Sequence, residues 1–61
     1  MTNHIFAAAA DNAVRNVIIN EDSATITFVF IDGAKSETPI ASSVKATIAS
    51  FDKSGEWVRV Q

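Results

Sequence analysis

Cysteine is absent from this chain of 61 residues, and histidine occurs once, as His4. The first absence excludes disulfide bonds, and the two together exclude a zinc site made of cysteine and histidine ligands. A chain of this length buries only about 60% of the surface that it exposes when unfolded. Without a crosslink, its stability must come from close packing or from association with another chain.

Glycine is also scarce, and Gly33 and Gly55 lie too far apart to form a phosphate-binding loop. The acidic residues lack the alternating spacing of a calcium loop. His4 lies close to the start of the chain, where a catalytic imidazole would be poorly positioned. Glu21 and Asp22 are adjacent acids, but they fall in a predicted turn. The sequence therefore predicts a protein that is not an enzyme, with no cofactor, no metal ion and no small-molecule substrate.

Basic residues and long apolar runs are few as well. Five bases face seven acids, which gives a formal charge of −2. Binding to nucleic acid relies on Lys and Arg near the phosphates, so this balance makes it unlikely as the main function. No apolar run approaches the roughly 20 residues that span a bilayer, so we expect no membrane association. Together with the lack of cysteine, this predicts a cytoplasmic protein.

Hydrophobic residues make up 48% of the chain, which favours a folded domain over disorder. From Ile5 to Val17, apolar side chains recur at three- and four-residue steps around four consecutive alanines. Alanine has the highest helix propensity, and Thr2 or Asn3 could cap the first turn. This pattern predicts a helix over about residues 4 to 16. Such a short helix is marginal alone, so we expect it to pack on a sheet.

The middle of the chain has the pattern of two β-hairpins. Residues 16–20 read NVIIN, and a polar turn at residues 21–23 separates them from a strand over residues 24–31. Asp32-Gly33 follows at once and predicts a tight type I′ turn. Residues 34–38 should then return antiparallel as a short polar strand at the edge of the sheet.

Residues 39–51 fit two interpretations. In a helix, Thr38 would be the N-cap, Pro39 would occupy the first helical position, and Gly55 would end the helix. One stripe would then hold Ile40, Val44, Ile48 and Phe51. In a strand, residues 44–49 alternate, residues 52–55 form a turn, and Phe51 lies opposite Trp57. Residues 56–60 form a final strand in either case.

Both interpretations give one small α+β domain over residues 1–61. We expect an antiparallel β-sheet of three to five strands with one or two helices packed on one face.

The run TITFVFI at residues 25–31 indicates where function should lie. It begins as an alternating strand and then becomes apolar on both faces. Once a helix covers one face, Val29 and Ile31 remain on the other, and no part of a single-layer domain is left to cover them. We therefore expect a protein-interaction module, with an interface formed by Val29, Ile31, Phe51 and Trp57. The expected partner is a second copy, most simply in a dimer, or another protein such as a host protein bound by a phage or mobile-element product.

The sequence WVRV at residues 57–60 supports an alternative function. In the strand interpretation, an aromatic and basic sheet face could bind single-stranded nucleic acid. Its candidate residues are Lys45, Lys53, Trp57 and Arg59. A simpler interpretation of the same sequence is that Trp57 completes the core and Arg59 lies in solvent. The helix interpretation of residues 39–51 favours this simpler role.

Overall fold

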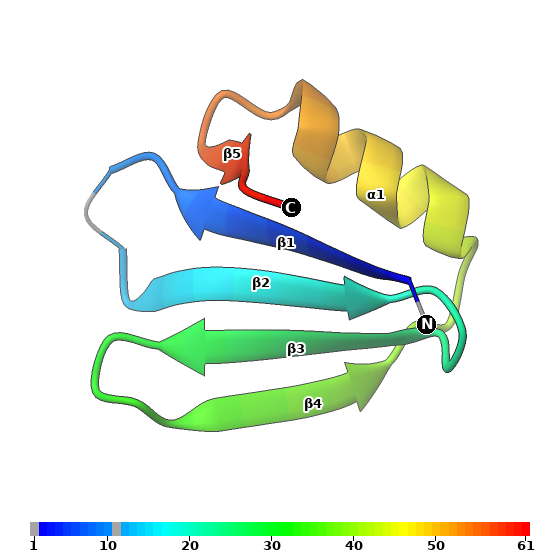
Figure 1. Cartoon of the computed structure of the whole chain (residues 1–61), viewed down its shortest axis with the longest axis horizontal. Helices are drawn as coiled ribbons and strands as arrows, with labels where there is room; N and C mark the ends of the chain where they lie inside the picture. Colours follow the sequence, from blue (N-terminus) through cyan, green and yellow to red (C-terminus); the bar gives the residue numbers. More distant parts are fainter. Residues whose placement is uncertain (1, 11) are drawn as a thin grey trace.

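The computed structural model describes residues 2–10 and 12–61 as a single sheet and one helix (Figure 1). In chain order the elements are β1 (Asn3–Ala8), β2 (Val14–Asn20), β3 (Thr25–Phe30), β4 (Lys35–Pro39), α1 (Val44–Lys53) and β5 (Trp57–Arg59). The strand order is β4-β3-β2-β1-β5, and every neighbouring pair is antiparallel. The predicted α+β class is therefore confirmed. No helix in this part of the chain is both long and apolar enough to cross a membrane.

The predicted N-terminal helix is wrong. Residues 3–8 form strand β1, which lies between β2 and β5 and pairs with both, while residues 14–17 belong to β2. Asp11, inside the predicted helix, lies outside the described residues. Helix propensity is a weak preference, and here the ladder hydrogen bonds to two neighbours and the burial of Phe6 outweigh it. The apolar spacing that suggested a helix joins side chains of two different strands.

Both predicted hairpins are present. In the second, Phe28 of β3 lies opposite Ser36 of the edge strand β4. The turn between these strands is not type I′, because Asp32 lacks the positive φ that this turn requires. The Gly33 amide donates to the Phe30 carbonyl and the Phe30 amide donates to the Ala34 carbonyl, so the loop has three residues. Gly33, with φ of 92°, provides the left-handed residue that closes such a loop.

The helix interpretation of residues 39–51 is correct, but the predicted start is wrong. Pro39 ends β4, and the ladder continues through the Ile40 amide, which donates to the Ala24 carbonyl. The helix starts only after Ser43, whose hydroxyl accepts a hydrogen bond from the Ala46 amide. It ends at Ser54, which is extended, so Gly55 does not close the helix in a left-handed conformation. Thr38 therefore caps no helix.

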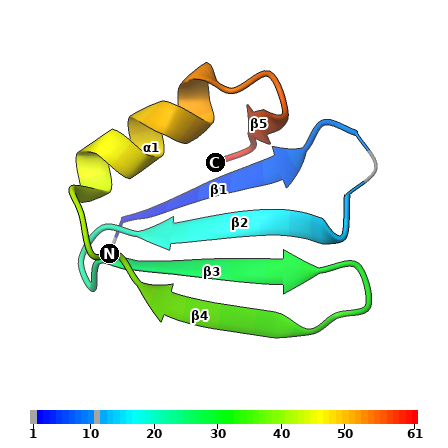
Figure 2. The ribbon, with the colours of Figure 1, turned by 180° about the vertical axis from the view of Figure 1, so that it is seen from behind.

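The core lies between α1 and the β1–β2 part of the sheet. Phe6, Val17 and Ile19 are fully buried, and Ile48 of the helix packs against them. A ring of partly buried side chains surrounds these four: Val14, Ile26, Phe28, Ile40, Val44, Phe51 and Trp57. In Figures 1 and 2 the helix lies along the β1–β5 side of the sheet, and β3 and β4 extend away from it.

Candidate functional site

The sheet face opposite the helix carries a second set of apolar side chains. Successive side chains of a strand point to opposite faces, and directly opposed residues share a face. Phe6 and Val17 point toward the helix, so Ile5 and Ile18, which are paired with each other, point away from it. By the same alternation the apolar members of this open face are Ile5, Ala7, Ile18, Val29, Val58 and Val60.

Accessibility agrees with this assignment. Val58 and Val60 are 53% and 58% exposed, although both belong to the C-terminal segment that pairs with β1. Ile5, Ile18 and Val29 are partly buried, and their cover comes from neighbours within the sheet. All the described helices and strands are either members of the sheet or lie on its other face. The open face is therefore an apolar surface that the described chain leaves in solvent.

Polar side chains border this apolar patch and also lie within it, where Asn16 is opposite Ala7 and Val29, and Thr27 is opposite Ile18. Asn3, Asn20 and Thr25 lie at one end of the strands, and Lys35 and Glu37 lie along the β4 edge. Protein–protein contact surfaces likewise combine apolar side chains with polar ones.

The structure divides the four residues predicted for the protein interface. Val29 lies on the open face. Ile31 follows β3 in the hairpin loop, where it is 68% exposed and its amide donates to the Ala13 carbonyl. Phe51 and Trp57 lie on the opposite side of the sheet, where the Phe51 ring contacts both Phe6 and Trp57.

The aromatic contacts show why Phe51 and Trp57 face inward. The Phe51 ring stacks on Phe6 with centroids 5.3 Å apart and meets Trp57 edge-on at 5.6 Å. These contacts attach α1 and β5 to the core. Phe51 and Trp57 also line a shallow hollow of about 180 Å³ with Ser50 and Ser54. Small-molecule pockets usually enclose several hundred cubic ångströms, so this hollow is a poor ligand site.

The four nucleic-acid candidates do not form one stacking surface. Lys45 and Lys53 lie on the helix, and Trp57 packs against the core. Arg59 makes a bidentate ion pair with Asp52, at 2.9 Å from Nε and 2.7 Å from Nη2, and lies 4.9 Å from the centre of the Phe6 ring. Its guanidinium is thus already occupied by a carboxylate and an aromatic ring.

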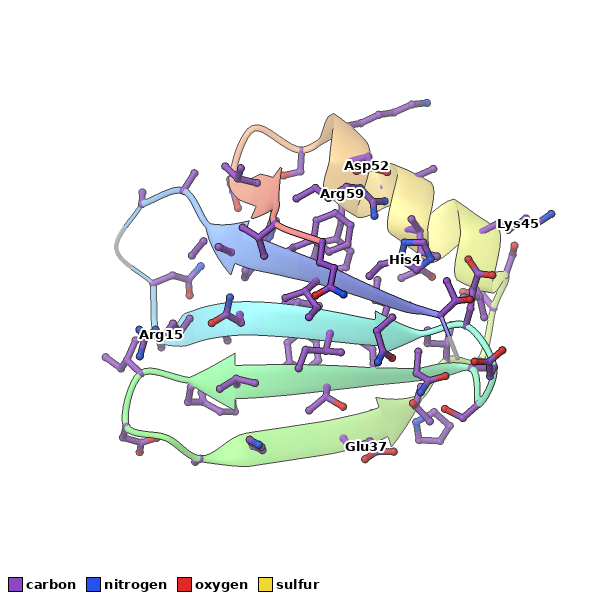
Figure 3. All side chains as sticks on the ribbon, viewed as in Figure 1. His4, Arg15, Glu37, Lys45, Asp52 and Arg59 are labelled. Carbon is purple, nitrogen blue, oxygen red and sulfur yellow. The ribbon has the colours of Figure 1, made fainter. Side chains whose placement is uncertain are left out.

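This ion pair is part of a chain of polar contacts at the helix side (Figure 3). Arg59 Nη1 lies 2.8 Å from His4 Nδ1, and His4 Nε2 lies 2.7 Å from Glu21 Oε1. Since a guanidinium can only donate, the neutral imidazole accepts at Nδ1 and donates from Nε2 to Glu21. Hydrogen bonding to Arg59 lowers the pKa of Asp52, desolvation opposes this effect, and the charge of Arg59 lowers the pKa further. The hydrogen bond to Asp52 raises the pKa of Arg59.

These contacts connect four segments of the chain: β1, the turn after β2, α1 and β5. Among the described residues, no three His, Cys, Asp or Glu side chains gather as a metal site. Comparison of the chain with protein-family models, with curated proteins and with solved structures finds no match.

Sequence reasoning missed these β-branched members of the open face: Ile5, Ile18, Val58 and Val60. The alternation in WVRV indicates where Val58 and Val60 lie, because Trp57 and Arg59 on one face of a strand place the two valines on the other face. The same alternation places Ile18 on the face opposite to that of Val17 and Ile19. Ile5 could not be placed in this way, because the sequence predicted a helix over residues 4–16.

Proposed function

We propose that this protein is a non-enzymatic protein-interaction module whose open sheet face binds a second copy of the same chain. The observation that carries the proposal is the apolar patch opposite the helix, centred on Ile5, Ile18, Val29 and Val58. Antiparallel sheets with one solvated face normally place polar residues there. Here six apolar side chains lie on that face, with Asn16 and Thr27 among them.

The size of the face supports a second copy as the partner. The two longer dimensions of the molecule, 28 and 24 Å, bound a face of roughly 670 Å² (28 × 24), close to the roughly 800 Å² per partner of a standard interface. Two such faces can pack as a sandwich about 10 Å thick, with their strands within about 30° of each other. A two-fold axis makes this contact self-complementary, so each copy uses the same patch.

Molar mass in solution tests the proposal. We expect the wild-type chain to form a dimer whose population rises with concentration, measured by size exclusion with light scattering. Val29→Glu and Val58→Glu should each weaken this association, because each places a carboxylate within the face-to-face contact. Val29→Glu should still fold, since position 29 lies opposite Lys35.

Ala49→Glu is the matched control, because it adds the same charge at an exposed position of the helix, on the other side of the sheet. Circular dichroism verifies that all three variants fold. A wild-type chain that stays monomeric at high concentration would overturn the proposal. So would a dimer whose dissociation constant both open-face variants leave unchanged.

A further inference from the structure

The free edge of the sheet at β4 has a specific pattern of backbone groups. The Phe30 amide donates to the Ala34 carbonyl, and the Ile40 amide donates to the Ala24 carbonyl, each at 2.8 Å. In an antiparallel ladder such pairs recur at every second residue, so Ser36 and Thr38 also direct their backbone groups toward β3. Lys35 and Glu37 therefore direct theirs outward. Pro39 does the same, and its missing N–H falls on the outward side, where the ladder does not need it.

The side chains of Lys35 and Glu37 match this edge. They lie opposite Val29 and Thr27, so both are on the open face, two residues apart and exposed. They carry opposite charges. The two residues of this edge whose backbone N–H and C=O groups both point outward thus carry a cation and an anion.

We infer that β4 pairs antiparallel with β4 of a second copy, about a two-fold axis through Ser36. In this register Lys35 of each copy lies opposite Glu37 of the other. Both residues have outward backbone groups, so each of the two pairs exchanges two main-chain hydrogen bonds. The same two pairs bring ammonium and carboxylate groups together across the junction.

The charges select this register over its neighbours. A two-residue shift in one direction places Lys35 opposite Lys35 of the second copy, and a shift in the other direction places Glu37 opposite Glu37. Like charges directly opposite each other destabilise a strand pair. A one-residue shift is excluded because it would oppose outward to inward backbone groups. Charged residues and proline often protect an edge strand from pairing, but a complementary pair of charges permits one partner.

This pairing goes beyond the proposed face-to-face contact and uses a different surface. Joining two β4 edges gives one continuous sheet with both helices on the same side. The two open faces then lie side by side on the other side, with the Lys35 and Glu37 side chains of both copies between them. The edge contact does not depend on the face contact, and each can be tested while the other is disabled.

Charge reversal tests the edge contact. In the Val58→Glu background, which disables the open face, we expect Lys35→Glu and Glu37→Lys each to weaken the remaining dimer by about tenfold or more, measured by sedimentation equilibrium. The double variant Lys35→Glu/Glu37→Lys restores the opposite charges across the axis and should recover the dimer. Failure of the double variant to recover it would overturn the inference, as would the absence of any dimer in the Val58→Glu background.

A cysteine crosslink tests the register itself. Because the chain has no cysteine, Ser36→Cys introduces a single thiol. In the inferred pairing the two copies of residue 36 form a non-hydrogen-bonded pair with Cα atoms about 4.5 Å apart, within the range that a disulfide spans. Thr38→Cys, on the same face of β4, would place its two thiols about 13 Å apart along the strands. We expect Ser36→Cys to form a disulfide-linked dimer at least tenfold faster than Thr38→Cys under mild oxidation, and equal rates would overturn the inferred register.

Discussion

Single residues in the turns adopt backbone conformations that depend on residue type. Gly33 has φ of 92° and Ala24 has φ of 55°, and both lie in connections between strands. Left-handed φ costs an L-residue with a Cβ atom roughly 1–2 kcal/mol, whereas glycine adopts it freely. Gly55 is outside this region. A Cβ atom at Gly33 or at Gly55 would meet no other atom within 4 Å. Both positions have room for a larger residue, so only the backbone angle φ distinguishes them.

We therefore predict opposite effects for reciprocal substitutions. Gly33→Ala should lower the free energy of unfolding by about 1 kcal/mol, and Ala24→Gly should raise it by a few tenths of a kcal/mol to about 1 kcal/mol, after the entropy cost of glycine. Gly55→Ala is the control and should change it by less than about 0.5 kcal/mol. Urea unfolding measures all three. Equal effects of Gly33→Ala and Gly55→Ala would contradict the assigned turn.

At the scale of elements, the sequence predicts the strands and the helix whose pattern lies within one segment of the chain. Asp32-Gly33 between apolar runs indicates a hairpin, and β3 and β4 form one. The exact turn type depends on the φ of Asp32, which the dipeptide does not determine. Residues 3–8 are predicted wrongly, because the pairing of β1 with β2 and β5 is a long-range effect that propensity does not contain. The helix is found with a late start, because Ser43 and Thr38 are both suitable caps and the ladder through Ile40 decides between them.

The cap gives a prediction for the helix. Ser43→Ala removes the hydroxyl that accepts from the Ala46 amide at 3.3 Å, and we expect it to cost about 1 kcal/mol. In a domain of this size that lowers the thermal midpoint by roughly 4–8 °C. Ser42→Ala, one residue earlier and exposed, should change stability by less than about 0.5 kcal/mol. Thermal unfolding followed by circular dichroism compares the two. If Ser42→Ala were the more damaging, the helix would start elsewhere.

At the scale of the whole molecule, the candidate surface is only partly visible in the sequence. The apolar second face of residues 25–31 was a sound signal, and Val29 lies on the open face. Phe51 and Trp57, which were predicted for the same interface, lie on the helix side, and large aromatic residues suit an interface and a small core equally well. Their place depends on where α1 lies, which is decided by the packing of Ile48 and Phe51 on Phe6. Periodicity within one segment carries no information about that contact.

The two ends of the chain meet in the polar contacts of His4, Asp52 and Arg59, and this gives a pH dependence to the whole fold. Arg59 lowers the pKa of Asp52 below its ordinary value of 3.8, chiefly through its hydrogen bonds. The unfolded chain therefore binds a proton at Asp52 more readily than the folded chain does. The stabilisation is fully present above the unfolded pKa and is lost as the pH falls through the folded pKa.

We predict that the thermal midpoint falls when the pH is lowered from about 5 to below 3.8, the ordinary pKa of this carboxyl group. Asp52→Asn should lower the midpoint at pH 5 and follow a flatter curve, approaching the wild type at the acidic end. Glu56→Gln is the matched control: it removes one carboxylate from an exposed turn beside the same strand and should leave the wild-type slope in place. Differential scanning fluorimetry at low salt measures the three curves, because exposed ion pairs are screened by salt. Parallel curves for Asp52→Asn and the wild type would mean that the Asp52–Arg59 pair does not join the helix to the last strand in solution.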